Sequence, residues 1–213
     1  MASNKPRILV LGGLGFIGRH LVKLLVDQNV ASKIRVVDKI MVQMARLGSQ
    51  FQPAFDKVET IQANLSNPDA VAKAFTDPEG DYNIVINLAG ETKLSQNDEV
   101  YAEGITKLST LVGQEALKHK TERFIEVSTG EVYEPHHKQS NESAKLHPWT
   151  GIGKAKLKAE EALKGLKGLP LIIVRPAYVY GPSDIRGLAP RLCIAAVYKK
   201  TGEKLEFPKW FEE

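Results

Sequence analysis

Short apolar runs alternate with helix-like segments along almost the whole chain, and this alternation is the feature that most constrains the fold. The runs are rich in β-branched residues and lack a period-two change from apolar to polar, as expected for strands covered on both faces of a parallel sheet. The alternation predicts a doubly wound α/β fold with right-handed crossovers. The predicted strands are 7–11, 34–37, 58–62, 84–88, 124–127 and 171–174, and the predicted helices are 16–27, 68–75, 99–118, 153–166 and 188–200.

Three glycines follow the first predicted strand and open the first predicted helix. Gly12, Gly15 and Gly18 stand in G-x-x-G-x-x-G spacing. Glycine permits a tight turn, lets the backbone approach a pyrophosphate, and allows close packing of helix and strand, while the positive end of the helix dipole faces the phosphates. The motif predicts a dinucleotide site, and Phe16 and Ile17 in the same turn are predicted to contact the cofactor.

Asp38 ends the second predicted strand, about twenty residues after the last of these glycines. A carboxylate there accepts hydrogen bonds from the adenosine ribose hydroxyls and repels a 2′-phosphate, so NAD is favoured. Lys39 and Arg35 leave NADP possible, because either cation would compensate a 2′-phosphate. Lys39 is also a predicted cofactor contact. Further predicted contacts follow the next two strands: Asn64 and Leu65 towards the adenine, and Leu88, Ala89 and Gly90 beside the dinucleotide.

Composition narrows the class of protein. The 213 residues fit one α/β domain with a buried core, and the net charge of +4 comes from lysines scattered among acids, without the basic stripe of a nucleic-acid-binding protein. Cys193 is the single cysteine, the first residues lack an apolar secretory core, and no run of about 18 apolar residues follows. We therefore predict a cytoplasmic location and no membrane contact. His136 and His137 have no ligand pair at metal spacing nearby, which predicts no metal site.

The segments 12–18, 37–38, 87–90, 126–133 and 174–182 together resemble the extended short-chain dehydrogenases/reductases of the NAD-dependent epimerase/dehydratase type. The resemblance implies a Rossmann fold that binds NAD, with Pro176 among the cofactor contacts, and a nucleotide sugar or similar carbonyl compound as substrate. It also implies a homodimer through helices 99–118 and 153–166. Residues 1–182 would form the dinucleotide-binding domain, and 183–213 the start of a C-terminal substrate lobe that is short or truncated.

In that family, the chemistry depends on a serine or threonine after the fifth strand and on a Tyr-x-x-x-Lys pair in the following helix. The resemblance places Ser128 and Thr129 at the first position, and Lys154 as the lysine that holds the nicotinamide ribose. Thr150 then stands where the family has its tyrosine. An aliphatic hydroxyl is a far weaker acid than a phenol, whose pKa is about 10, so the usual proton relay lacks a member.

Other residues leave the activity open. Gly104 replaces an asparagine that supports the lysine in the family, and no other tyrosine occupies the required place, while Glu131 and His147 remain looser candidates for acid/base work. Three hypotheses follow, and whether the chain is an enzyme stays undecided among them. The chain is an NAD-binding protein whose catalysis is lost or rerouted, an active oxidoreductase or epimerase on a nucleotide sugar with a substitute proton donor, or a non-catalytic scaffold subunit.

Overall fold

The computed structural model describes residues 5–135, 141–185 and 187–202. The chain divides into two compact units, Met1–Ala177 and Tyr178–Glu213. His136 and His137 lie outside the described residues. Within the described ranges, no group of three or more histidine, cysteine or acidic side chains is arranged to hold a metal ion.

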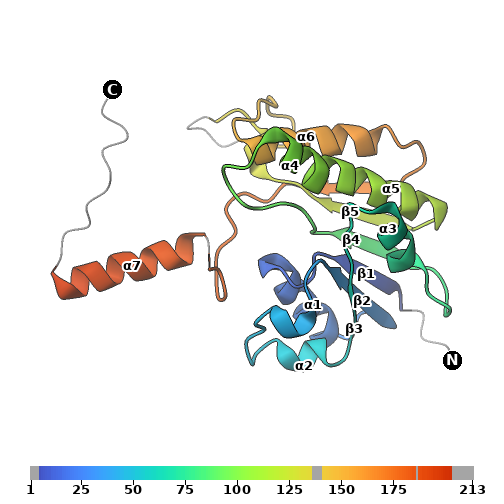
Figure 1. Cartoon of the computed structure of the whole chain (residues 1–213), viewed down its shortest axis with the longest axis horizontal. Helices are drawn as coiled ribbons and strands as arrows, with labels where there is room; N and C mark the ends of the chain where they lie inside the picture. Colours follow the sequence, from blue (N-terminus) through green and yellow to red (C-terminus); the bar gives the residue numbers. More distant parts are fainter. Residues whose placement is uncertain (1–4, 136–140, 186, 203–213) are drawn as a thin grey trace. The chain divides into compact units, whose positions relative to one another are not determined.

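The first unit contains a six-stranded sheet with the strand order β3-β2-β1-β4-β5-β6 (Figure 1). All five pairs of neighbouring strands are parallel. The strand order reverses between β1 and β4, so a ligand crevice is expected outside the carboxyl ends of these two strands. The predicted doubly wound parallel sheet is confirmed. Its strands are β1 (Arg7–Leu11), β2 (Lys33–Asp38), β3 (Glu59–Gln62), β4 (Ile84–Asn87), β5 (Arg123–Val127) and β6 (Leu171–Val174).

Helices cover both faces of this sheet (Figure 1), and alternate residues of β1 show how the two cores are divided. Ile8 and Val10 pack with α1 and α2 on one face, whereas Leu9 and Leu11 pack with α3, α5 and α6 on the other. This is the period-two geometry of a strand buried on both sides. The α-helices of this unit are α1 (Phe16–Asp27), α2 (Gln52–Phe55), α3 (Pro68–Phe75), α4 (Asp98–Tyr101), α5 (Leu108–Lys118) and α6 (Gly151–Lys164), with short 3₁₀ turns at η1 (Val42–Met44) and η3 (Gly130–Val132).

The helix predicted over 99–118 contains a π-helical segment, η2 (Ala102–Lys107), between α4 and α5. The carbonyl of Gly104 in this segment accepts the backbone N–H of Glu91 at 3.2 Å. A Cβ atom on Gly104 would lie 3.1 Å from Cβ of Glu91, so an asparagine there would press on the loop after β4. The expected pairing of this helix and α6 with a second copy of the chain stays a prediction.

The second unit contains α7 (Leu188–Thr201). Asp184 begins this helix by accepting hydrogen bonds from the backbone N–H groups of Gly187 (2.6 Å) and Ala189 (3.1 Å). Leu192, Ile194 and Val197 on α7 are exposed. The reading of 183–213 as the start of a substrate lobe stays a prediction. Nowhere in the described part of the chain is a helix both long and apolar enough to cross a membrane.

Candidate functional site

The glycine turn lies at the carboxyl end of β1, against the loop that follows β4. Gly12 has φ +74, and a Cβ atom on it would lie 2.6 Å from the backbone nitrogen of Ala89. Gly18 is equally constrained, because its Cβ atom would lie 2.6 Å from the carbonyl oxygen of Gly12. Gly15 is exposed, and the nearest atom to a Cβ there is the Gly12 oxygen at 3.3 Å. Two glycines therefore close the turn, and the third leaves its outer side open for a ligand.

The first turn of α1 follows directly and has no partner of its own for its N–H groups. Gly15 is the N-cap, no side chain caps this end, and the first turn carries no acidic residue. Phe16 packs edge-on against His20 with ring centroids 5.6 Å apart, and Ile17 is 37% exposed. An uncapped helix start beside open glycine backbone is the geometry that binds phosphate groups. The residues of this turn fit a dinucleotide pyrophosphate.

Asp38 stands beside this turn and lines a pocket of about 230 Å³. Its Oδ2 accepts the backbone N–H of Leu14 at 3.1 Å, and its Oδ1 accepts that of Ile40 at 3.4 Å. The carboxylate is therefore held at the rim of the glycine turn, where ribose hydroxyls would meet it. The pocket is otherwise lined mainly by apolar and uncharged side chains: Leu14, Val36, Ile40, Met41, Val42, Gln43, Thr60, Ile61 and Gln62.

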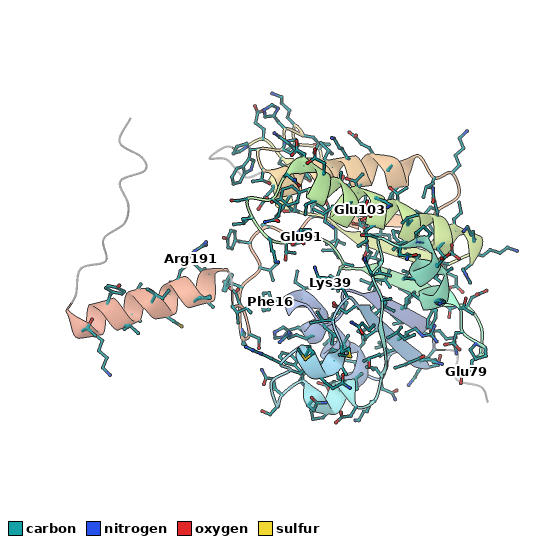
Figure 2. The ribbon with its side chains drawn as sticks, viewed as in Figure 1. Phe16, Lys39, Glu79, Glu91, Glu103 and Arg191 are labelled. Atoms are coloured by element: carbon teal, nitrogen blue, oxygen red, sulfur yellow. The ribbon has the colours of Figure 1, made fainter. Side chains whose placement is uncertain are left out.

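The two cations considered for a 2′-phosphate occupy different places. Arg35 is 4% exposed and binds Glu59 and Asp77, so its proposed role in compensating a 2′-phosphate is wrong. Lys39 is exposed, and its Nζ lies 3.8 Å from Oε2 of Glu91. Lys39 and Glu91 are labelled in Figure 2. Lys39 follows β2 and Glu91 follows β4, the strands on either side of β1. The pair therefore spans the carboxyl end of β1.

The remaining predicted cofactor contacts divide into two groups. Leu88, Ala89 and Gly90 follow β4 next to the glycine turn, and Leu88 N–H donates to the carbonyl of Leu11 at 2.8 Å. Leu65 does not line the pocket beside Asp38, because its side chain is 3% exposed and belongs to the core. Asn64 is exposed and instead accepts the N–H of Ser66 at 3.1 Å. Sequence reasoning missed the apolar side chains after β2 that line this pocket, including Ile40 and Met41.

At the carboxyl end of β5, Ser128 belongs to a buried ion-pair cluster. Its Oγ donates to Oε1 of Glu160 at 2.6 Å, and Nε of Arg175 donates to the same oxygen at 2.9 Å. Burial disfavours the charge of Glu160, but the hydrogen bonds from Arg175 and Ser128 outweigh it and lower the pKa of this carboxyl. Arg175 also donates to the hydroxyl of Tyr133 at 2.8 Å and lies over its ring. Tyr133 is therefore part of this cluster.

Thr129 and Pro176 lie around η3. Oγ1 of Thr129 accepts the N–H of Glu131 at 3.2 Å and so caps this short turn. The carbonyl of Pro176 accepts the N–H of Gly130 at 2.8 Å, which joins the ends of β5 and β6. The structure thus brings both residues to the same edge of the sheet as Ser128.

Thr150 is the N-cap of α6 and does not lie within the helix. Its Oγ1 accepts the N–H of Gly153 at 2.9 Å and donates to Oε2 of Glu131 at 2.5 Å. Lys154 is exposed, and it lines a separate surface pocket between α4, η2 and α6 that also contains Asp98. Lys154 therefore does not line the pocket beside Asp38, and its predicted contact with the cofactor stays a prediction.

Lys156, two residues after Lys154, faces the sheet. It is 8% exposed, and its Nζ donates to Oε1 of Glu126 at 3.0 Å and to the carbonyl of Val127 at 2.7 Å. A Cβ atom built on Gly90 would lie 3.8 Å from this Nζ, so the ammonium sits where the ends of β4 and β5 meet. Residues two positions apart on a helix point about 200° apart, so only one of the two lysines can face the sheet.

Counting back from Lys156 also changes the residue at the tyrosine position. Four residues before Lys156 stands Ile152, which is partly buried and packs against Tyr101, Ile105 and two alanines of α6. The expected pair of Thr150 and Lys154 is therefore two residues out of register with the pair that the fold brings to the site. Helix periodicity offered a signal for the correct register, because Lys156, Glu160 and Leu163 share the buried face of α6.

Comparison with known proteins agrees with this architecture. The model of the NAD dependent epimerase/dehydratase family matches residues 8–210. The chain belongs to this family. Among curated relatives of this epimerase/dehydratase chain, the dTDP-D-glucose 4,6-dehydratase of Dictyostelium discoideum is 30% identical over 84% of the chain and 45% of that protein. A putative UDP-glucose 4-epimerase of Methanocaldococcus jannaschii is 30% identical over 82% of the chain and 56% of that protein.

Several solved structures share the fold of this chain. Bordetella bronchiseptica WbmG in complex with NAD and UDP matches with a TM-score of 0.78 and 22% identity, over 95% of the chain and 62% of that protein. The dTDP-glucose 4,6-dehydratase DesIV of Streptomyces venezuelae, solved with NAD and DAU bound as a double mutant, matches with a TM-score of 0.77 and 21% identity, over 93% and 63%. The chain spans about half the length of the curated relatives named above.

Proposed function

We propose that this chain binds NAD along the carboxyl ends of β1, β2 and β4, in the crevice expected where the strand order reverses, which is called the groove below. The observation that carries the proposal is the glycine turn, in which Gly12 closes against Ala89 while Gly15 stays open beside an uncapped helix start. The Asp38 carboxylate at the rim of this turn adds an acceptor for ribose hydroxyls. Structural relatives that hold NAD support the same cofactor.

The charges around Asp38 favour NAD over NADP. A 2′-phosphate would meet the Asp38 carboxylate, and Arg35 is bound to Glu59 and Asp77 and cannot offset the repulsion. Lys39 is the cation next to Asp38 in sequence, and Glu91 faces it at 3.8 Å. A phosphate that recruited Lys39 would have to compete with Glu91. We therefore expect NAD to bind more tightly than NADP.

Lys156 takes the part that the family gives to its active-site lysine. Its ammonium lies between Gly90 and the end of β5, where it would donate to the nicotinamide ribose. NAD, when bound, would supply a hydride acceptor at this end of the groove. Ile152 carries no exchangeable proton, so a substrate hydroxyl there would have no phenol to receive its proton. The ordinary chemistry of the family is accordingly lost or rerouted in this chain.

A rerouted reaction is the second candidate, and the position of Glu131 favours it. This half-buried carboxylate follows β5 and accepts the hydroxyl hydrogen of Thr150 at 2.5 Å. It is the first acidic group after Ser128 and Thr129 in the sequence, and a carboxylate can accept a proton from a substrate hydroxyl. An active chain would use it on a nucleotide sugar or a similar carbonyl compound.

Titration with NADH, followed by nucleotide fluorescence, tests the proposal. Wild-type chain is expected to bind NADH with a dissociation constant in the micromolar range, and Gly15→Asp should abolish binding by placing a carboxylate against the pyrophosphate. Leu24→Asp is the matched control, because Leu24 is 50% exposed in the middle of α1 and away from the groove. No binding by wild type at millimolar NADH would overturn the proposal.

The second candidate needs a separate assay. Conversion of a panel of UDP- and dTDP-sugars in the presence of NAD would be followed by chromatography of the sugar products, together with NADH absorbance, for wild type and for Glu131→Gln, because an epimerase or dehydratase returns the hydride to the sugar and leaves no net NADH. Turnover by wild type that disappears in Glu131→Gln supports the rerouted reaction. Binding of NADH without turnover of any sugar leaves the first proposal as the function and removes the second.

A further inference from the structure

Glu126 is a charged residue in the interior of the sheet, on the strand that carries Ser128 at its end. Its side chain is 0% exposed. Burying a carboxylate costs far more free energy than burying an apolar side chain of the same size, unless the charge is paired and its oxygens are hydrogen-bonded. Both conditions hold here, and the partners come from β4, α5 and α6.

Two neutral side chains fix the orientation of the Glu126 carboxylate. Oγ of Ser109 donates to Oε1 at 2.9 Å, and Nδ2 of Asn87 donates to Oε2 at 2.6 Å. The Asn87 amide has its own orientation fixed, because its Oδ1 accepts the N–H of Ala89 at 3.1 Å. Asn87 and Ser109 are both 0% exposed, so the whole arrangement is shielded from water.

The fixed carboxylate in turn holds the ammonium of Lys156. An ammonium has three N–H donors. Glu126 and the carbonyl of Val127 take two of them, at 3.0 and 2.7 Å, and within the described part of the chain no further acceptor lies at hydrogen-bonding distance. The third donor is left beside Gly90, at the groove.

We propose that Glu126 is a positioning residue for dinucleotide binding: it holds the Lys156 ammonium in place so that the third N–H donor meets a ribose hydroxyl of the cofactor. The inference rests on the proposed NAD site. It goes beyond that site because it assigns a role to a buried strand residue that lies away from the groove. The competing role is structural, in which the ion pair only ties α6 to β5.

Glu126→Gln separates these roles, because glutamine keeps the size of the side chain but removes the counter-charge and replaces one of the two acceptor oxygens with an NH2 donor. NADH affinity is expected to fall roughly tenfold at pH 7, the loss typical of one hydrogen bond to a charged group. It should fall further as pH rises towards 9, since a buried ammonium without a counter-charge gives up its proton more readily. In wild type the affinity should stay level over this range. Several other ionisable side chains on the elements around Lys156 have partners elsewhere, and Lys154 and Lys158 on the same helix are exposed. Those with partners are Glu91, Glu103, Lys107, Glu131, Glu160 and Arg175.

Glu122→Gln is the matched control, because Glu122 is an exposed carboxylate immediately before β5 that binds Asn83. It should leave NADH affinity unchanged at every pH. If wild type binds NADH and Glu126→Gln binds it equally well from pH 7 to 9, the pair is structural and the inference is wrong. If wild type itself does not bind, the proposed NAD site fails first and the inference falls with it.

Folding of the variant is checked by circular dichroism before any titration. If Glu126→Gln does not fold, Glu126→Asp is used instead. Aspartate keeps the charge, but its side chain is one methylene shorter, so the carboxylate lies farther from Lys156. That variant should bind NADH several-fold more weakly than wild type without acquiring a pH dependence, because the ammonium moves but stays paired. Wild-type affinity in Glu126→Asp would contradict the positioning role.

Discussion

Individual hydroxyl groups at the carboxyl edge of the sheet are used for local structure. Ser128 donates to Glu160, Thr129 caps η3, and Thr150 caps α6 while donating to Glu131. None of the three has the length of a tyrosine phenol. At the residue scale, the consequence is that these three hydroxyl groups stabilise the local structure of the edge.

Thr150→Ala should therefore lower stability without changing cofactor binding. Loss of an N-cap typically lowers the free energy of unfolding by about 1 kcal/mol. Urea denaturation measures the loss, and Thr150→Ser, which keeps the hydroxyl, should stay close to wild type. NADH affinity is expected to be the same in all three proteins, and a large loss of affinity in Thr150→Ala alone would mean that the hydroxyl contacts the ligand.

At the element scale, α6 presents two lysines to two different surroundings. Lys156 faces Glu126 and the carbonyl of Val127, and Lys154 faces outward beside Asp98. The rotation between them follows from helix geometry alone. What decides which lysine faces inward is the packing of α6 on the sheet, through the buried side chains Ala159, Glu160 and Leu163.

Lys156→Met and Lys154→Met form a matched pair of variants that tests which of the two lysines faces the sheet. Lys156→Met removes one partner of a buried ion pair, which should lower the free energy of unfolding by about 3 kcal/mol and weaken NADH binding by about tenfold or more. Lys154→Met should change neither quantity. Urea denaturation and NADH titration measure both effects, and the reverse result would restore the register with Thr150 and Lys154.

At the scale of the molecule, charges gather at both ends of the sheet but serve different purposes. A second cluster ties β1, β2 and β3 to the loop after α3 through Asp77, whose side chain is 0% exposed. Its Oδ2 lies 2.9 Å from Arg7, 2.8 Å from Lys33 and 3.0 Å from Arg35, and it accepts the hydroxyl of Tyr82 at 2.6 Å. This cluster stabilises the fold at the end of the sheet away from the groove.

Burial disfavours the charge of Asp77, but hydrogen bonds from Lys33 and Tyr82, together with the nearby charge of Arg35, outweigh it and lower its pKa well below the usual value. Its contribution to stability is therefore fully present above the unfolded pKa of about 3.9 and is lost as pH falls below that value towards the folded pKa. Asp77→Asn should lower the free energy of unfolding by about 3 kcal/mol at pH 7. The difference from wild type should narrow at pH 3.

Urea denaturation at the two pH values checks this expectation, with Asp56→Asn as the control, because Asp56 is an exposed residue after α2 that binds only Gln52 among the described side chains. A difference between wild type and Asp77→Asn that stays constant from pH 7 to pH 3 would contradict the assignment of the lowered pKa to this carboxyl.

The sequence by itself determined the six strands, the longer helices, their order and the glycine turn. The bounds of β1, β6, α1 and α3 coincide with those predicted, because strand and helix periodicity and turn residues act locally. The same local signals predicted the positions of Gly12 and Asp38 in the fold, since both residues stand directly at strand ends.

Only the tertiary structure decided which side chains of those elements meet. Lys156 faces the end of β5 and Lys154 does not, and Thr150 caps α6 without lying inside it. Leu65 packs in the core, and Glu126 pairs with the ammonium of Lys156, which is 30 residues away in sequence. Spacing along one chain cannot fix such pairings, because the rotation of a helix about its own axis is set by the packing of its buried face against the sheet.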